Sequence, residues 1–203
     1  MKVHHATFLT LAVAAPVLLA ACKPKDNAAA SRDSAAGAVP AAATDTTART
    51  TSAPSLTDPN IVFILDQANV ADSARGKVAE TKGTSADVKN FGRLMVGEHH
   101  ALRLQGQQLA TKLSVTPQPP AGDQSDAQAK QEMDSLQAMP KGKAWDKAYI
   151  DYEVTYHQAV LQTATKALGA AQNQELKALI TKAAPVIQHH LDRALAIQKK
   201  LGT

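Results

Sequence analysis

The sequence has almost no cysteine and few aromatic residues. Its 203 residues include one cysteine and only 3% Phe, Trp and Tyr, whereas hydrophobic residues make up 44%. A single cysteine excludes an intrachain disulfide and any metal site that needs several thiolates. A composition poor in aromatic residues and rich in alanine favours packed helices over a sandwich of strands. We therefore expect an all-α protein.

The sequence also lacks the motifs of common enzyme classes and a strong charge of either sign. It contains no serine or cysteine nucleophile motif, no phosphate-binding loop and no Cys-x-x-Cys-His haem attachment. The formal net charge is +4, and from Asp58 onward 17 Lys and Arg face 15 Asp and Glu. Nucleic-acid binding requires basic residues clustered on one face. The sequence therefore indicates no nucleic-acid partner and favours a protein without enzymatic activity.

The one cysteine, Cys22, lies at the end of an export signal. A short positive start precedes an apolar run over residues 6–21, which is too short and wrongly flanked to span a membrane. The run ends in Leu19-Ala20-Ala21-Cys22, which resembles the bacterial lipobox. Residues 1–22 are thus predicted to be a lipoprotein signal peptide with Cys22 as the lipidation site. An ordinary cleaved signal with a chance cysteine is the alternative.

Acylation of Cys22 would anchor the chain to a membrane, because two or more buried acyl chains hold a protein stably. The residue after the cysteine is Lys23 and not Asp. By resemblance to lipoprotein sorting in bacteria with two membranes, this favours the outer membrane, facing the periplasm. Residues 23–57 are mostly Ala, Thr, Ser, Pro and charged residues. They predict a disordered tether, because such a segment cannot bury enough apolar surface to fold.

Apolar residues spaced three and four apart predict helices throughout residues 58–203. The first begins at Asp58-Pro59, as N-cap and first turn, and the second is capped by Thr84 or Ser85. Pro185 should kink the last helix. We expect five helices. The first covers about residues 58–82, and the second runs from the cap at Thr84 or Ser85 to about residue 113. A short and mostly polar helix covers 125–138, and two long helices cover 144–171 and 174–201.

The lengths of the connections predict the fold. Short links near Gly83 and near 170–173 make each pair of long helices antiparallel neighbours, and the longer 114–142 segment joins the two pairs. Gly92, Gly97 and Gly106 in the second long helix would permit close contact between helices. We expect a four-helix bundle with a long crossover that carries a short extra helix.

One titratable residue lies on the apolar face of each long helix. At 100° per residue, Asp72, His99, His157 and His190 fall in the middle of the four apolar stripes, whereas His100 and His189 point away from them. Counted along the helices from the turns, the four lie within about two helical turns of the same height. We therefore expect them to meet in the interior of the bundle.

Imidazole and carboxylate side chains from facing helices are the groups from which bundles build metal sites. Asp72, His99, His157 and His190 would suit zinc, iron or copper, with Glu98 and Glu153 as hydrogen-bonding partners of the ligands. A non-covalent haem between two of the histidines is a further option. Alternatively, the same residues satisfy one another in a hydrogen-bonded network that only fixes how the helices pack.

A second stripe on the third long helix is aromatic. It consists of Trp145, Tyr149, Tyr152 and Tyr156. One interpretation is a redox-active or ligand-stacking surface. We favour the other, in which these rings pack against the 114–142 crossover.

Several segments resemble those of a known family. They are Ile64-Leu65-Asp66-Gln67-Ala68-Asn69 leading to Asp72, Met95-Val96-Gly97-Glu98-His99, Trp145-Asp146-Lys147-Ala148-Tyr149 with His157-Gln158, and Pro185 through His190-Leu191. The chain is similar here to the ferritin-like bacterial envelope proteins grouped as domain-of-unknown-function family 4142. The resemblance implies a ferritin-like four-helix bundle. In that family Glu is usual in place of Asp72, and Asp in place of Glu98.

The resemblance does not imply a ferritin-type di-iron centre. Such centres place Glu-x-x-His on two helices, and no Glu-x-x-His precedes His99, His157 or His190. Two functions remain. The chain is an envelope lipoprotein that binds a metal ion through the Asp and His cluster, or a metal-free structural or stress-related envelope protein that acts through a protein partner.

Overall fold

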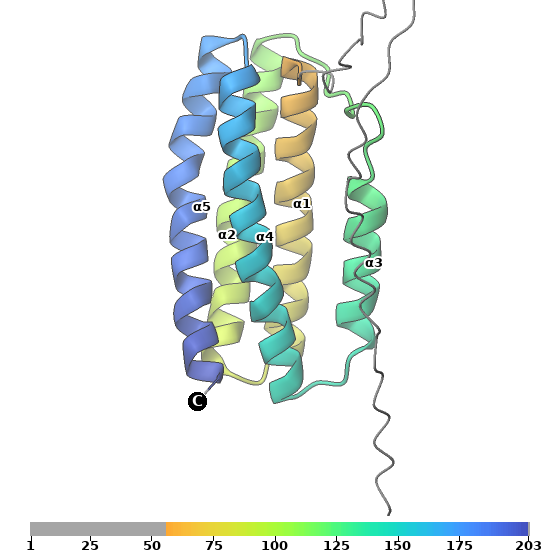
Figure 1. Ribbon diagram of the computed structural model, residues 1–203, viewed down its shortest axis with the longest axis vertical. Helices are drawn as coiled ribbons and strands as arrows, with labels where there is room; N and C mark the ends of the chain where they lie inside the picture. The colour runs from red at the N-terminus through yellow and green to blue at the C-terminus, as the bar shows by residue number, and fades with distance from the viewer. Residues whose placement is uncertain (1–55, 203) are drawn as a thin grey trace, which may run out of the picture. The chain divides into compact units, whose positions relative to one another are not determined.

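The computed structural model describes residues 56–202, and the secondary structure in this range is entirely helical. None of the helices there is both long and apolar enough to cross a membrane. The predicted all-α four-helix bundle is confirmed: four long helices lie side by side and a shorter one lies in the crossover (Figure 1). They are α1 (Asp58–Lys82), α2 (Ala86–Lys112), α3 (Ser125–Ala138), α4 (Lys143–Ala170) and α5 (Gln174–Leu201).

Two predictions concern residues that are not described. The signal peptide over residues 1–22, with the lipidation site Cys22, lies outside the described range. So does the predicted tether over 23–57, apart from its last two residues.

The four long helices form a closed ring in the order α1, α2, α5, α4, because each contacts the next and α4 contacts α1. In Figure 1, α1 and α5 run downward while α2 and α4 run upward, so every neighbouring pair is antiparallel. The connection from α2 to α4 therefore has to return along the length of the bundle. The short helix α3 lies in this connection and packs on α1. One long crossover of this kind is the connectivity of ferritin-like folds.

The N-cap of the first helix is one residue earlier than the sequence predicted. Thr57, not Asp58, is the N-cap: its hydroxyl accepts a hydrogen bond from the Asn60 backbone N–H at 3.4 Å, and the Asn60 side chain accepts one from the Thr57 N–H at 3.1 Å. This reciprocal pair is a capping box. The Asp58 carboxylate instead accepts hydrogen bonds from the backbone N–H groups of Gln172 and Asn173, at 2.8 and 3.0 Å. It thereby fixes the start of α1 to the α4–α5 turn.

The turn between α1 and α2 is fixed to the start of α4. Ser85 caps α2 through a 3.2 Å hydrogen bond from the Asp87 N–H to its hydroxyl. Its neighbour Thr84 donates its N–H and its hydroxyl to the buried carboxylate of Asp146, at 2.8 and 2.6 Å. Of the two residues that the sequence offered as the cap, Ser85 is the cap and Thr84 holds the turn against α4.

The interior consists of two clusters of buried apolar residues, one toward each end of the bundle. The cluster near the α1–α2 turn includes Phe91, Met95 and Trp145, and the cluster near the α4–α5 turn includes Ile61 and Leu176. All residues of both clusters lie between Leu56 and Leu201. A chain from Arg49 to Thr203 therefore contains the residues of its own core.

Only one of the three glycines in α2 lies at a close helix contact. A Cβ on Gly92 would lie 2.7 Å from the backbone oxygen of Gly76, so these two residues bring α1 and α2 together. At Gly97 and Gly106 an added Cβ would meet no atom within 4 Å in the described part of the chain. The last helix, α5, continues on both sides of Pro185.

Candidate metal centre

The four titratable residues on the apolar stripes are all buried and lie together between the two apolar clusters. Asp72, His99, His157 and His190 have 0–1% of their surface exposed. One nitrogen from each of the three histidines lies within 4.8 Å of the others, and Asp72 forms a second group of the same compactness with Glu153 and His157. Asp72 Oδ2 is 3.5 Å from His99 Nε2. The structure thus brings one predicted residue from each long helix to a common site.

Hydrogen bonding fixes which nitrogen of His99 carries the proton. The Asn69 side chain donates through Nδ2 to the Leu65 carbonyl at 2.7 Å, so its Oδ1 faces His99 Nδ1 at 2.8 Å. An amide oxygen only accepts, and therefore His99 Nδ1 is the donor. In the neutral ring, Nε2 then carries a lone pair.

The other two histidines are held in the same manner by different acceptors. His157 Nδ1 donates to the backbone carbonyl of Glu153 at 2.9 Å, so in the neutral ring the lone pair is on Nε2. His190 Nε2 donates to the Glu98 carboxylate on α2 at 2.7 Å, which leaves the lone pair on Nδ1. The three rings pack against one another with centroids 4.9–5.8 Å apart. This contact leaves no room for a porphyrin between any two of them, so the haem option does not fit the site.

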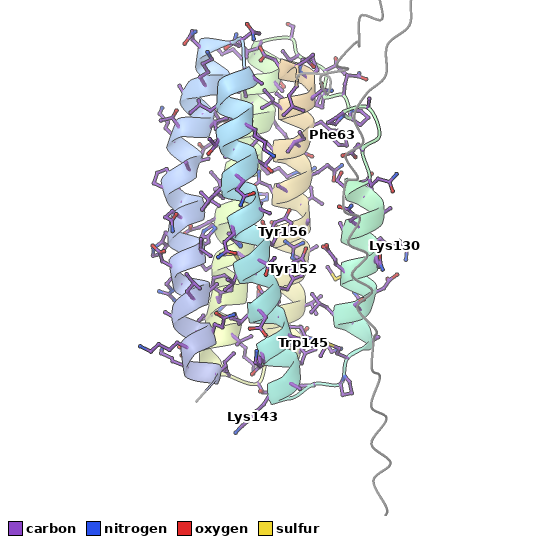
Figure 2. The ribbon with its side chains drawn as sticks, viewed as in Figure 1. Phe63, Lys130, Lys143, Trp145, Tyr152 and Tyr156 are labelled. Carbon is purple, nitrogen blue, oxygen red and sulfur yellow. The ribbon has the colours of Figure 1, made fainter. Side chains whose placement is uncertain are left out.

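A buried arginine holds the two carboxylates. The Arg75 guanidinium donates to Asp72 Oδ1 and, at 3.0 Å, to Glu153 Oε1. It is 2% exposed and lies over the rings of Tyr156 and Tyr152, 4.1 and 4.7 Å from their centroids (Figure 2 shows both tyrosines on α4). Such cation–π contacts help to offset the desolvation of the guanidinium.

The protonation of the histidines follows from their burial and their neighbours. Burial lowers the pKa of His99 to about 3 and that of His190 to about 4, with nearby histidines adding to both shifts. Burial also acts to lower the pKa of His157, but the hydrogen bond to Glu153 and the charge of Asp72 outweigh it and raise that pKa. His99 and His190 are therefore neutral at pH 7, with free lone pairs.

Five side chains of the site share one arrangement: one polar atom is held by an outer partner and another is buried without a hydrogen-bond partner among residues 56–202. Buried polar atoms are rarely left in this state in folded proteins. Arg75 holds the two carboxylates from one side, and Asn69, the Glu153 carbonyl and Glu98 hold the three rings. The unpartnered atoms are Asp72 Oδ2, Glu153 Oε2, His99 Nε2, His157 Nε2 and His190 Nδ1.

A sixth buried atom without a hydrogen-bond partner in the described range is the hydroxyl of Tyr149. It lies on α4 one turn before Glu153. Burial raises its pKa well above the usual value, and the charges of Glu153 and Asp72 act in the same direction. Tyr149 is therefore a neutral phenol next to the carboxylates.

The two glutamates that were expected beside the ligands have different places. Glu98 lies partly exposed and accepts from His190, as an outer partner does. Glu153 is fully buried, and its Oε2 is one of the unpartnered atoms, so it has the position of a ligand. The neighbouring histidines His100 and His189 are exposed.

Arg75 and Asn69 belong to the site although apolar spacing does not single them out. Asn69 and Arg75 lie three residues before and after Asp72, on the same face of α1. This i±3 spacing is the signal that could have found them.

The aromatic stripe packs against the crossover, as the favoured interpretation predicts. Trp145 Nε1 donates to the Leu136 carbonyl of α3 at 2.7 Å, and the Tyr152 hydroxyl donates to Glu132 of α3. The Trp145 ring also stacks on Tyr149, with centroids 5.4 Å apart. The stripe thus connects α3 to the side of α4 that carries the site.

One protein family matches the chain in sequence. The match covers residues 42–197, and the family is described as a domain of unknown function (DUF4142). It is the family that the sequence segments resemble. No curated protein and no solved structure matches the chain significantly.

Proposed function

The chain belongs to the family described as a domain of unknown function (DUF4142), and we propose that it is an envelope lipoprotein that binds one transition-metal ion within its helical bundle. His99, His157 and His190 supply nitrogen ligands, and Asp72 supplies an oxygen ligand. Glu153 is positioned to supply a second oxygen. The lipid anchor at Cys22 holds this bundle at the outer membrane, facing the periplasm.

The observation that carries the metal proposal is the set of five unpartnered buried atoms. Three imidazole nitrogens and two carboxylate oxygens are buried without hydrogen-bond partners among the described residues, and each ring is oriented by a hydrogen bond from its other nitrogen. Protein metal sites orient their histidines in this way. Two of these atoms lie close to an opposite partner: His99 Nε2 is 3.5 Å from Asp72 Oδ2, and Glu153 Oε2 is 3.4 Å from His157 Nδ1. The Tyr149 hydroxyl is a buried donor among the described residues without a partner, but its single proton can satisfy only one of the five atoms.

The charge of the site also favours a cation. Asp72 and Glu153 are two buried acidic side chains, and Arg75 is the only buried Lys or Arg beside them in residues 56–202. Glu98 adds a further negative charge beside His190. A divalent ion would reduce the electrostatic cost of the buried acidic groups, and it would compete with the proton that the raised pKa of His157 favours.

The ligand types select among metals. Imidazole and carboxylate without thiolate suit zinc, iron or copper, whereas calcium and magnesium prefer oxygen ligands alone. Bound there, such an ion would bridge all four long helices. A free coordination position would allow it to bind or polarise a small ligand.

The experiment uses the untagged chain Arg49–Thr203 and three single variants, His99→Ala, His157→Ala and His190→Ala. Elemental analysis should find one metal ion per chain in the wild type and much less in the variants. At about 100 times its dissociation constant the metal should stabilise the fold by about 2.7 kcal/mol, which is about 5–10 °C in Tm. A chelator should remove this gain.

The matched controls are His100→Ala and His189→Ala, which remove exposed histidines next to His99 and His190. They should retain the metal and the response to the chelator. A wild-type chain that binds no metal, or that loses it equally in the controls, would leave the metal-free, partner-binding alternative. The anchor is tested separately, because Cys22→Ser in the full chain should release the protein from the membrane fraction.

A further inference from the structure

The half of the bundle beyond the histidines contains a cavity that is partly open to solvent, and of the proposed metal ligands only His99 lines it. It has a volume of about 210 Å³ and lies among α1, α2, α4 and α5, on the side of the α4–α5 turn. Its polar end is formed by His99 and Asn69, which face each other through the 2.8 Å hydrogen bond. Asp72, Glu153 and the other two central histidines do not line it. The cavity is thus a second feature of the interior, adjacent to the cluster.

The lining of this cavity is almost entirely apolar. Aliphatic side chains such as Leu65, Leu102, Leu179 and Ile187 make up most of it, and no Asp, Glu, Lys or Arg takes part. A charged ligand would find no partner here and would have to give up its hydration. A neutral hydrocarbon group would lose only contact with water, which is favourable.

Small residues provide the space. Ala68, Ala164 and Ala183 lie on the lining, one on each of three helices, and Gly106 contributes no side chain from the fourth. A Cβ at Gly106 would meet nothing within 4 Å in the described structure. The opposite half of the bundle differs, since it contains the large side chains of Phe91, Met95, Trp145, Tyr149 and Ile150, which are 0% exposed.

The cavity is partly open: Ala159 on its lining is exposed, and Ile64 and Leu102 are half-buried. An engineered apolar cavity of about 150 Å³ stays dry and binds benzene. The cavity described here is larger than that, at about 210 Å³. Its size fits a single substituted ring or a short alkyl chain.

We propose that this cavity is a binding site for a neutral hydrocarbon group about the size of toluene, held between the four long helices with one end against His99 and Asn69. The site is formed by the bundle itself and does not require the metal.

The test compares toluene with benzoate, which has a ring of similar size but carries a charge. The chelator-treated chain Arg49–Thr203 is melted with either compound at about ten times the expected dissociation constant. Toluene should raise Tm by about 3 °C through its binding to the folded state, and benzoate should not. Because metal is absent from this measurement, its outcome is independent of the proposed function.

Two variants, Ala164→Leu and Ala183→Leu, fill the cavity from different helices. Either should abolish the toluene shift, so the test remains valid if one of them fails to fold. The matched control is Ala178→Leu, which changes an exposed alanine of α5 outside the lining and should keep the shift. The proposal is overturned if toluene leaves the wild type unchanged. It is also overturned if benzoate acts equally, or if the filled variants respond as the control does.

Discussion

Replacing Arg75 by methionine removes the only buried Lys or Arg side chain in the described part of the bundle. The guanidinium is 2% exposed and pairs with Asp72 and Glu153, both 0% exposed. Without Arg75, the carboxylates of Asp72 and Glu153 remain buried but lose the guanidinium that pairs with them. Breaking a buried pair by removing one partner costs about 3–5 kcal/mol, and the lost contacts with Tyr152 and Tyr156 add about 1 kcal/mol. A domain of this kind has a free energy of unfolding of about 5–15 kcal/mol. The variant should therefore be near the limit of folding.

Arg103→Met is the matched control for this substitution. Arg103 on α2 also pairs with an aspartate, Asp66, at 2.9 Å, but its side chain is 41% exposed. Exposed ion pairs of this kind contribute about 0–1 kcal/mol. Urea denaturation of both metal-free variants measures the difference, which should be at least about 2 kcal/mol.

A combined variant identifies the origin of the loss. Asp72→Asn and Glu153→Gln remove the charges that Arg75 neutralises, so adding them to Arg75→Met should recover part of the stability. Such recovery is the non-additivity expected of residues in one network. The reasoning is refuted if Arg75→Met unfolds at the same urea concentration as Arg103→Met, or if the added substitutions only destabilise further.

Two further predictions concern the packing of α2 and the titration of the histidines. Gly92→Ala should destabilise the chain by about 1–3 kcal/mol, because its Cβ would overlap a backbone oxygen of α1. Gly97→Ala should instead stabilise the chain by about 0.8–1 kcal/mol through helix propensity. Equal Tm values for the two variants would contradict this prediction. The metal-free chain should lose stability as the pH falls from 6.5 toward 4, because the pKa of His99 is lowered to about 3 and that of His190 to about 4, so the unfolded chain takes up protons first. Each contributes about 1.4 kcal/mol per pH unit, whereas the raised pKa of His157 lowers stability only as the pH rises above 6.5. Urea titrations at several pH values should show a shallower slope for His99→Gln, and an unchanged slope would contradict the assignment.

The helices could be predicted from the sequence because their apolar residues recur every three or four positions. The prolines after Leu113 and the short links at Gly83 and Asn173 mark their ends. The N-cap of α1 could not be assigned in the same way, because Thr57, Asp58 and Asn60 are all suitable capping residues. Asp58 is used by the α4–α5 turn, and that contact exists only in the folded chain.

The centre of the site could also be predicted, since a polar residue within an apolar stripe has to face the interior. The surrounding residues could not be predicted by that criterion. Arg75 has a long cationic side chain of a type that is usually exposed. Its burial is favourable because it pairs with Asp72 and Glu153 and lies over two tyrosine rings of α4. The acceptors of the histidines likewise depend on how the helices rotate against each other, so Asn69 and Glu98 acquire their roles through packing.

The central claim is that three imidazoles on three helices bind one metal ion. X-ray absorption spectroscopy of the metal-loaded chain Arg49–Thr203 tests it most directly, because multiple scattering from imidazole rings reports how many histidines are bound. We expect three histidines and one or two oxygens about 2.0–2.2 Å from the metal, with one histidine lost in His157→Ala. A spectrum with oxygen ligands only, or one that is unchanged in His157→Ala, would contradict the claim.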